Sequence, residues 1–143
     1  MDKYLNKDVA RITGLKQSTI AYYSDKGIVE PSVSKGTGRG SNRYYGKVDL
    51  VKFITIGLLS DSGVSLKKIQ QIFTEQRIVI DPLITRYLEP WDSTIKPIML
   101  RIYNVHDVKK MKADVAVGVI AASDYASCLL IDMTKVIARV AKL

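Results

Sequence analysis

Side chains that could bind the phosphates or base edges of a nucleic acid are concentrated in the first half of the chain. Residues 17–26 form a short polar stretch that ends at Gly27, and residues 32–48 are rich in glycine and cations and contain no acidic residue. A short helix beside a cationic loop is how small proteins present one element to a DNA groove and another to the flanking phosphates. The pattern therefore predicts double-stranded DNA as the partner.

Three groups of side chains are candidates for this contact. The first group lies at the start of the polar stretch, together with Tyr22 on its outer side, and would reach base edges or a phosphate. The second group lies in the cationic loop and would bind phosphates. A third group begins a later helix, whose dipole favours an anion. The alternatives are a solvated helix start, a solvated loop, and an ordinary capping serine with exposed lysines. The candidates are Lys16, Gln17, Ser18, Tyr22, Lys35, Arg39, Arg43, Tyr44, Lys47, Ser65 and Lys67.

Two short helices joined by a glycine turn are expected to carry the first group. Asn6 is expected to cap a helix over residues 7–13, which Gly14 would end in a left-handed conformation. A second helix over residues 17–26 places Tyr23 on its inner side and its polar residues outside. This arrangement is a helix-turn-helix.

The cationic loop is expected to form a hairpin, or wing, over residues 28–45. Residues 36–40 include three glycines, which forbid a helix and suit a flexible tip between two short strands. A third helix is expected over residues 49–61. Ser65 would then cap a fourth helix over residues 66–73. The apolar residues of this helix, including Leu66, are expected to face inward.

Taken in order, these pieces resemble the DNA-binding domain of the MerR family of bacterial transcription regulators, over residues 4–73. The motifs are Tyr22-Tyr23 with Gly27-Ile28-Val29-Glu30-Pro31, Arg43-x-Tyr45, Asp49-Leu50 at a helix start, and Gly63-Val64-Ser65-Leu66-x-x-Ile69. Ala21 stands where the family usually has an arginine, and the wing is longer than usual, so Arg39 or Lys35 is expected to compensate. The resemblance implies a homodimer that bends and untwists palindromic promoter DNA and thereby acts indirectly on RNA polymerase.

The second half of the chain departs from the long dimer helix of that family. Pro82 removes a backbone donor and disfavours helix at the preceding residue, so the helical stretch 74–80 is expected to stop before it. A separate short helix is expected over residues 81–88, with Pro82 in its first turn. Dimer contacts must then come from another part of the C-terminal half.

Three strands and a last helix are expected to complete the chain. The strands are predicted at residues 98–103, 115–120 and 126–131, with Asp132 or Thr134 capping the helix. The predicted fold class is therefore α+β, with a winged helix-turn-helix domain at residues 1–75. Residues 76–143 would form a small α+β domain for dimerisation, or for binding an effector or partner.

Composition excludes several classes of protein. The 143 residues carry a formal net charge of +8, which attracts polyanions, although charge alone would also fit RNA or an anionic membrane. The N-terminus has no apolar signal region and no run is long enough to span a bilayer, so we expect a cytoplasmic, nucleoid-associated protein with no membrane partner. One cysteine and one histidine leave no set for an intrachain disulfide or a metal site, and no cofactor is expected.

Three residues of the second half have distinctive chemistry without a motif. His106 is expected in a loop, and Cys128 as a small buried apolar residue, with a redox sensor as the alternative. Trp91 is expected to anchor the junction between domains, or to stack on an effector or a dimer partner. No set of nucleophile, base and oxyanion donors is visible, so we do not expect an enzyme.

The sequence therefore predicts a dimeric, MerR-like transcriptional regulator. The alternative is an architectural or partition protein that binds DNA and docks another protein through its C-terminal domain. A genome-wide footprint separates the two, because a regulator occupies few palindromic promoter sites.

Overall fold

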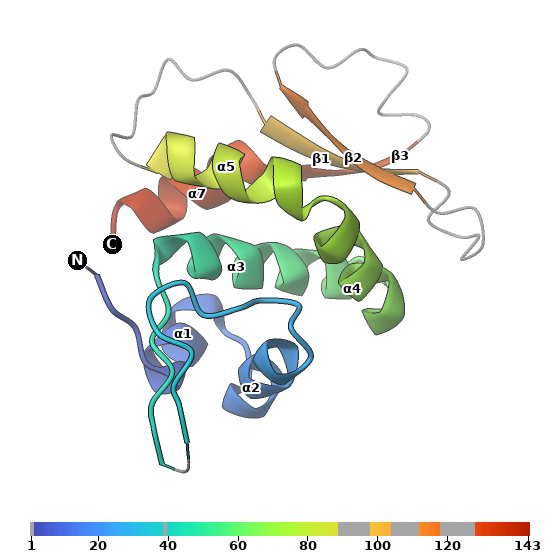
Figure 1. The fold of residues 1–143 in the computed structure, drawn as a ribbon. Coiled ribbons are helices and arrows are strands. Elements are labelled where there is room, and N and C mark those ends of the chain that lie inside the picture. Colours follow the sequence, from blue (N-terminus) through green and yellow to red (C-terminus); the bar gives the residue numbers. More distant parts are fainter. Residues whose placement is uncertain (1, 39, 89–97, 104–111, 118–127) are drawn as a thin grey trace.

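The computed structural model describes residues 2–38, 40–88, 98–103, 112–117 and 128–143 (Figure 1). The elements, in chain order, are α1 (Asn6–Thr13), α2 (Gln17–Asp25), α3 (Lys47–Asp61), α4 (Leu66–Glu75), α5 (Arg77–Leu88), β1 (Ile98–Tyr103), β2 (Lys112–Val117), β3 (Cys128–Asp132) and α7 (Met133–Ala141). Helices α1 and α2 lie on one side of α3, and α5, α7 and the sheet lie on the other.

The first two helices form the expected helix-turn-helix, although α1 begins differently. Its N-cap is Leu5, whose N–H donates to Asp8 Oδ2 at 3.0 Å, so the prediction that Asn6 caps this helix is wrong. An acidic residue three positions into a helix can bond back to the cap amide, and here that contact fixes the start. The predicted stop at Gly14 is confirmed, because its φ is 78° and its N–H donates to the Ala10 carbonyl.

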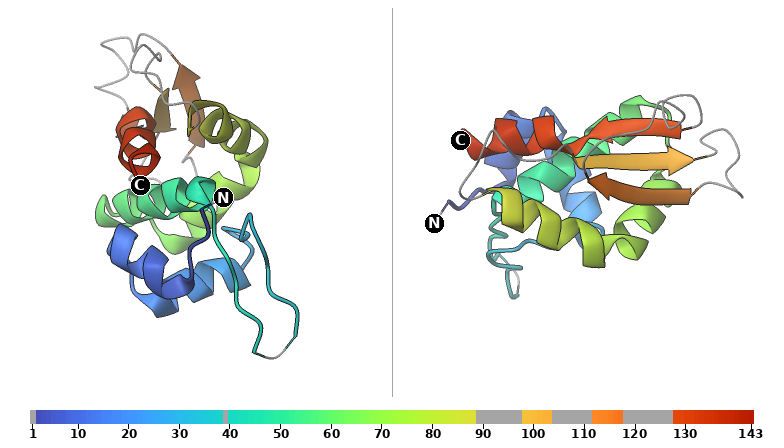
Figure 2. Two further views of the ribbon diagram at one scale, coloured as in Figure 1. Left: turned by 90° about the vertical axis from the view of Figure 1, so that its left-hand side faces the viewer. Right: turned by 90° about the horizontal axis from the view of Figure 1, so that it is seen from above.

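The wing projects beyond α1 and α2 as a hairpin (Figures 1 and 2). Two short strands were expected, but single bridges hold the hairpin: Ser34 pairs with Tyr44, and Tyr45 pairs with Tyr4 near the N-terminus. Gly36 has a φ of 69°, which turns the chain out of the extended conformation two residues after Ser34. A longer ladder therefore cannot form on that side.

Helix α3 is the central element of the fold. It begins at Lys47, two residues before the expected start, because Gly46 is its N-cap and donates its N–H to Asp49 Oδ2 at 2.9 Å. It is buried along most of its length and contacts α1, α4, α5 and α7. A helix that is apolar on several faces must be covered on several sides.

Helix α4 confirms one prediction and corrects another. The Ser65 hydroxyl accepts a hydrogen bond from the Lys68 N–H at 3.4 Å and caps the helix as expected. Leu66, expected to face inward, is 41% exposed. The other three residues predicted to face inward, Ile69, Ile72 and Phe73, are buried.

Helix α5 corrects the expectation that Pro82 separates two segments. The chain breaks at Gln76, the C-cap of α4, and α5 then continues through Pro82. Ile80, Ile84 and Leu88 are buried at a spacing of four residues on both sides of the proline. Burial of this stripe outweighs the single backbone donor that the proline removes.

The remaining elements form an antiparallel sheet and a final helix. The strand order is β2-β1-β3, with Ile98 opposite Val117 and Met99 opposite Asp132. The first strand has its predicted bounds, but β2 begins three residues before the predicted start at 115, and β3 ends one residue after the predicted end at 131. Residues 118–120 and 126–127 of these two predictions lie outside the described residues. Asp132, one of the two expected caps, accepts from the Lys135 N–H at 3.2 Å and begins α7.

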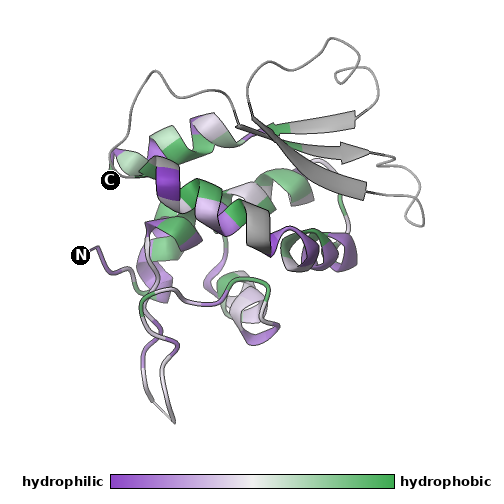
Figure 3. Cartoon of the chain, turned by 45° about the horizontal axis from the view of Figure 1, so that its top comes forward, coloured by the Kyte–Doolittle hydropathy of each residue, from purple (hydrophilic) through white to green (hydrophobic). Residues whose placement is uncertain are grey.

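Helix α7 connects the end of the chain to the N-terminal half. Its apolar residues, with Ile137 fully buried, face α3 and α5, and Figure 3 shows the hydrophobic residues on these helices. Thr55 of α3 contacts the Met133 sulfur at 3.4 Å, and the Arg139 guanidinium donates to the Ile12 carbonyl at the end of α1 at 2.8 Å. Core contacts thus cross residue 75, and the predicted division into domains there stays a prediction.

Candidate nucleic-acid interface

The start of α2 presents polar groups to solvent. Lys16 is the N-cap, and Lys16, Gln17 and Ser18 are all exposed, as the sequence predicts for residues that reach a groove. No side chain of the described residues caps this helix. Its first-turn amides and its positive dipole end therefore remain suited to an anion such as a phosphate.

The two tyrosines of α2 face different environments. Tyr22 is 41% exposed, whereas Tyr23 is 5% exposed and lies in the core. Their rings meet edge to face with centroids 5.9 Å apart, and the Lys26 ammonium lies 5.8 Å from the centroid of the Tyr22 ring. Burial raises the pKa of Tyr23, with the neighbouring Tyr22 adding to the shift. Tyr22 is the exposed member of the pair, and its hydroxyl can donate to a phosphate.

A hollow of about 490 Å³ lies between the wing and the starts of α1 and α2. It brings together Gln17, Lys35 and Arg43, three of the predicted contact residues from two separate segments. Asn6 and Lys7 of α1 also line it, and the sequence interpretation did not include them. The available signal was their position in the first turn of the helix that precedes the predicted recognition helix.

Arg43 binds a carboxylate at the far end of the recognition helix. Its guanidinium pairs with Asp25, the last residue of α2. The hydrogen bond to this carboxylate is the main reason that the pKa of Arg43 is raised. Beside this pair the hydroxyls of Ser24 and Tyr45 are 2.9 Å apart. Tyr45 is fully buried and packs edge to face on Phe53 at 5.5 Å. The returning arm of the wing is thus attached to α2 at two points.

Two further wing cations also have acidic partners. Lys35 lies 2.9 Å from Glu30, and Lys47 lies 3.1 Å from Asp2. The sequence between residues 32 and 48 contains no acid, but the fold brings acids to it from elsewhere in the chain. A charge count restricted to residues 32–48 misses both partners, because Glu30 lies just before that segment and Asp2 lies near the N-terminus.

The other candidates lie in separate places. Tyr44 is half-buried and pairs with Ser34 through its backbone, and Arg39 lies outside the described residues. Ser65 caps α4 and Lys67 is exposed in its first turn. Figure 1 shows α4 on the opposite side of α2 from the wing, so any DNA contact by these two residues would be separate from the wing contacts.

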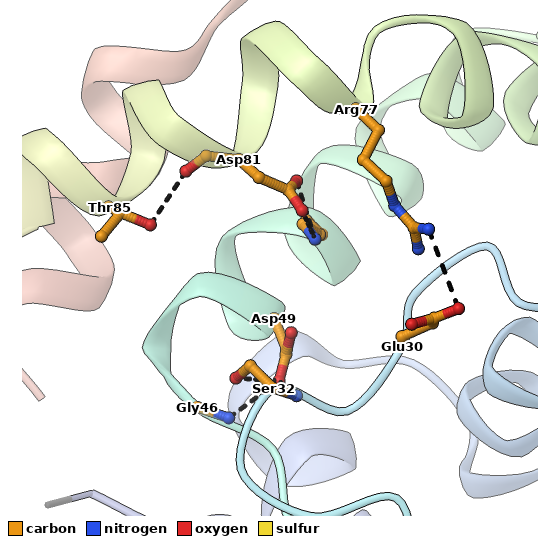
Figure 4. Close-up of polar contacts among 8 residues, drawn as sticks. Glu30, Ser32, Gly46, Asp49, Arg77, Asp81 and Thr85 are labelled. Carbon is orange, nitrogen blue, oxygen red and sulfur yellow. Dashed lines mark hydrogen bonds and ion pairs between the residues drawn. The ribbon is translucent and has the colours of Figure 1, made fainter.

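A buried carboxylate anchors the base of the wing (Figure 4). Asp49 Oδ2 accepts from the Ser32 N–H at 2.8 Å, the Ser32 hydroxyl at 2.7 Å and the Gly46 N–H at 2.9 Å. Burial raises the pKa of Asp49, against the opposing effect of these bonds, and its Oδ1 has no partner among the described residues. This side chain, which the sequence interpretation noted only as a helix start, joins both arms of the wing to α3.

Other kinds of site have less support. Among the described residues no three His, Cys, Asp or Glu side chains are grouped so as to hold a metal ion. His106 and Trp91 lie outside the described residues, and of Cys128 only the backbone, the first residue of β3, is described. No described helix combines the length and apolar character needed to cross a membrane.

A helix-turn-helix with a hairpin beside its second helix, and cations on both, defines a winged helix-turn-helix protein of the DNA-binding class. The sequence matches the MerR HTH regulatory protein family over residues 4–76, just over half of the chain. The protein therefore belongs to the MerR family of DNA-binding transcription regulators, and the resemblance seen over residues 4–73 is confirmed. No curated protein matches the sequence significantly.

Proposed function

We propose that this protein is a homodimeric regulator that binds palindromic promoter DNA and distorts it to control transcription. The observation that carries the proposal is the hollow between the wing and α2, where exposed polar and cationic groups from two segments converge. Family membership supports DNA binding as the activity. The dimer, the distortion and the effect on RNA polymerase are the proposed additions.

In this proposal α2 enters the major groove. Gln17 and Ser18 meet base edges, while Lys16 and the Tyr22 hydroxyl bind phosphates at either end of the exposed face. Lys35, with the other cations and Tyr44 of the wing, binds the outer backbone. The wing is also attached to α2 through the Ser24 and Tyr45 hydroxyls, and we expect the duplex to bend so that both elements bind together.

The two-fold symmetry of a palindrome requires a two-fold protein. Helix α5 has 12 residues, so a pairing surface based on it needs further contribution from the sheet. We propose that residues 76–143 act as a small α+β unit for dimerisation, or for binding an effector or partner. The proposed location is the bacterial cytoplasm, at the nucleoid.

Selection of bound duplexes from a random pool, followed by footprinting, tests this function. We expect an inverted repeat, protection at two successive major grooves and enhanced cleavage between them where the DNA is bent. Sedimentation of the full chain should give a dimer at micromolar concentration. Enrichment of no sequence, with occupancy spread along DNA, would support the architectural alternative, and a full-length monomer would contradict the proposed symmetry.

A further inference from the structure

Lys35 lies between two hollows of the molecule. One is the hollow between the wing and α2, where it is accompanied by Gln17 and Arg43. The other, also about 490 Å³, lies between the wing base, α3 and α5, where Glu30 and Arg77 accompany it. The lysine can therefore point toward DNA or toward α5, but not toward both.

In the second hollow Glu30 holds two cations at once. Its Oε2 lies 2.9 Å from the Lys35 ammonium, and its Oε1 lies 3.7 Å from the Arg77 guanidinium, the contact drawn in Figure 4. Glu30 lies near the start of the wing, while Arg77 is the first residue of α5. The bond from Lys35 and the charge of Arg77, in that order, lower the pKa of Glu30, so this carboxylate stays ionised.

A phosphate contact by Lys35 changes the balance of charge in this hollow. The lysine must leave Glu30, and the ionised carboxylate then lies near the DNA backbone with one partner fewer. Like charges repel, and a carboxylate without a cation would also pull the lysine back. Arg77 can offset both effects, because it binds the other oxygen and does not have to move.

We propose that Arg77 is a positioning residue for DNA binding, which retains the Glu30 carboxylate when Lys35 leaves it for a phosphate. This inference rests on the proposed function. Because Arg77 begins α5, and α5 packs on α3 and α7, a shift of α5 would change how readily Lys35 is released. The C-terminal half thereby influences the wing without contacting DNA.

A double-mutant cycle on the full chain tests the inference. Fluorescence anisotropy would measure binding of the selected duplex by wild type, Arg77→Gln, Glu30→Gln and the double variant. The matched control is Arg86→Gln, which removes the same charge from the same helix. We expect Arg77→Gln to weaken binding by roughly two- to fivefold more than the control, as for exposed ion pairs. In the Glu30→Gln background Arg77→Gln should cost no more than Arg86→Gln.

Two further measurements separate positioning from a general loss of charge or fold. Arg77→Lys keeps the cation and should retain most of the affinity. Without DNA, the carboxyl resonance of Glu30 in NMR should titrate at higher pH in Arg77→Gln than in wild type. Equal losses of DNA affinity in Arg77→Gln and Arg86→Gln would overturn the positioning role, as would a loss that persists in the Glu30→Gln background. The proposed function would remain intact in both cases, because the wild type still binds DNA. Failure of the wild type to bind duplex DNA would overturn both.

Discussion

Replacing Arg43 by alanine tests whether the wing binds phosphates. The guanidinium pairs with Asp25 in the DNA-free protein, so binding exchanges one anionic partner for another and yields only part of a charge-assisted hydrogen bond. We expect Arg43→Ala to weaken binding to cognate and unrelated duplexes alike by about 1 kcal/mol, or roughly fivefold. Losing one phosphate contact should reduce the magnitude of the salt slope by about 0.9, so the effect of the substitution should shrink about 3.5-fold between 50 and 200 mM salt.

Anisotropy titrations at several salt concentrations measure both quantities. Asp25→Asn is the matched variant, since it keeps Arg43 and removes the competing carboxylate, and it should strengthen binding up to about fivefold with an unchanged slope. Lys142→Ala, outside the predicted contact residues, controls for net charge. Neither substitution removes the Ser24 or Tyr45 hydroxyl, so the contact between them should still hold the wing to α2. An unchanged slope in Arg43→Ala would refute a phosphate contact by this arginine, and weaker binding in Asp25→Asn would mean that Asp25 positions Arg43 instead of competing for it.

Three other substitutions test base reading, the wing anchor and the C-terminal helix. Gln17→Ala should cost about 1–3 kcal/mol on the cognate duplex and little on random DNA, and an equal loss on both would assign Gln17 to a phosphate. Burial raises the pKa of Asp49 in the folded protein above its value in the unfolded chain. Between these two pKa values the folded protein retains a proton that the unfolded chain releases. The free energy of unfolding should therefore fall as pH rises through that interval, by at most about 1.4 kcal/mol per pH unit. Asp49→Asn can still accept the three hydrogen bonds but has no proton to release. In urea melts its unfolding free energy should lack this dependence on pH, and a dependence identical to that of wild type would mean that another group causes it. Ile137→Ala should cost about 2–5 kcal/mol of unfolding free energy in the same assay, and a loss under 1 kcal/mol would show that α7 contributes little to the core.

Features decided by neighbouring residues were predicted well. Gly14 ends α1 with a positive φ, and Ser65 and Asp132 cap their helices, because each of these contacts spans at most four residues. The exposed start of α2 also follows from its polar residues. The error at Asn6 has the same local scale, since Asp8 accepts the Leu5 N–H three residues before it and the helix begins at Asn6 itself.

Features decided by distant residues were missed. Pro82 has a strong local preference to begin a helix, but burial of Ile84 and its neighbours against α3 and α7 keeps α5 continuous. Asp25, which pairs with Arg43, lies 18 positions away in the sequence, and Glu30, which pairs with Lys35, lies just before the acid-free segment 32–48. Charge counted along the segment therefore overstated how available its cations are for DNA.

These missed contacts change how the wing should be understood. A cation with no partner gains a full interaction when it meets a phosphate, and it gains nearly the same on any DNA. A cation that must first leave Asp25 or Glu30 gains less, so non-specific affinity falls while the base contacts proposed for Gln17 keep their value. Because one of those acids also binds Arg77, the helix that begins the C-terminal half sets part of that cost. The ion pairs of the wing would then raise the ratio of specific to non-specific binding and give α5 a means of adjusting it.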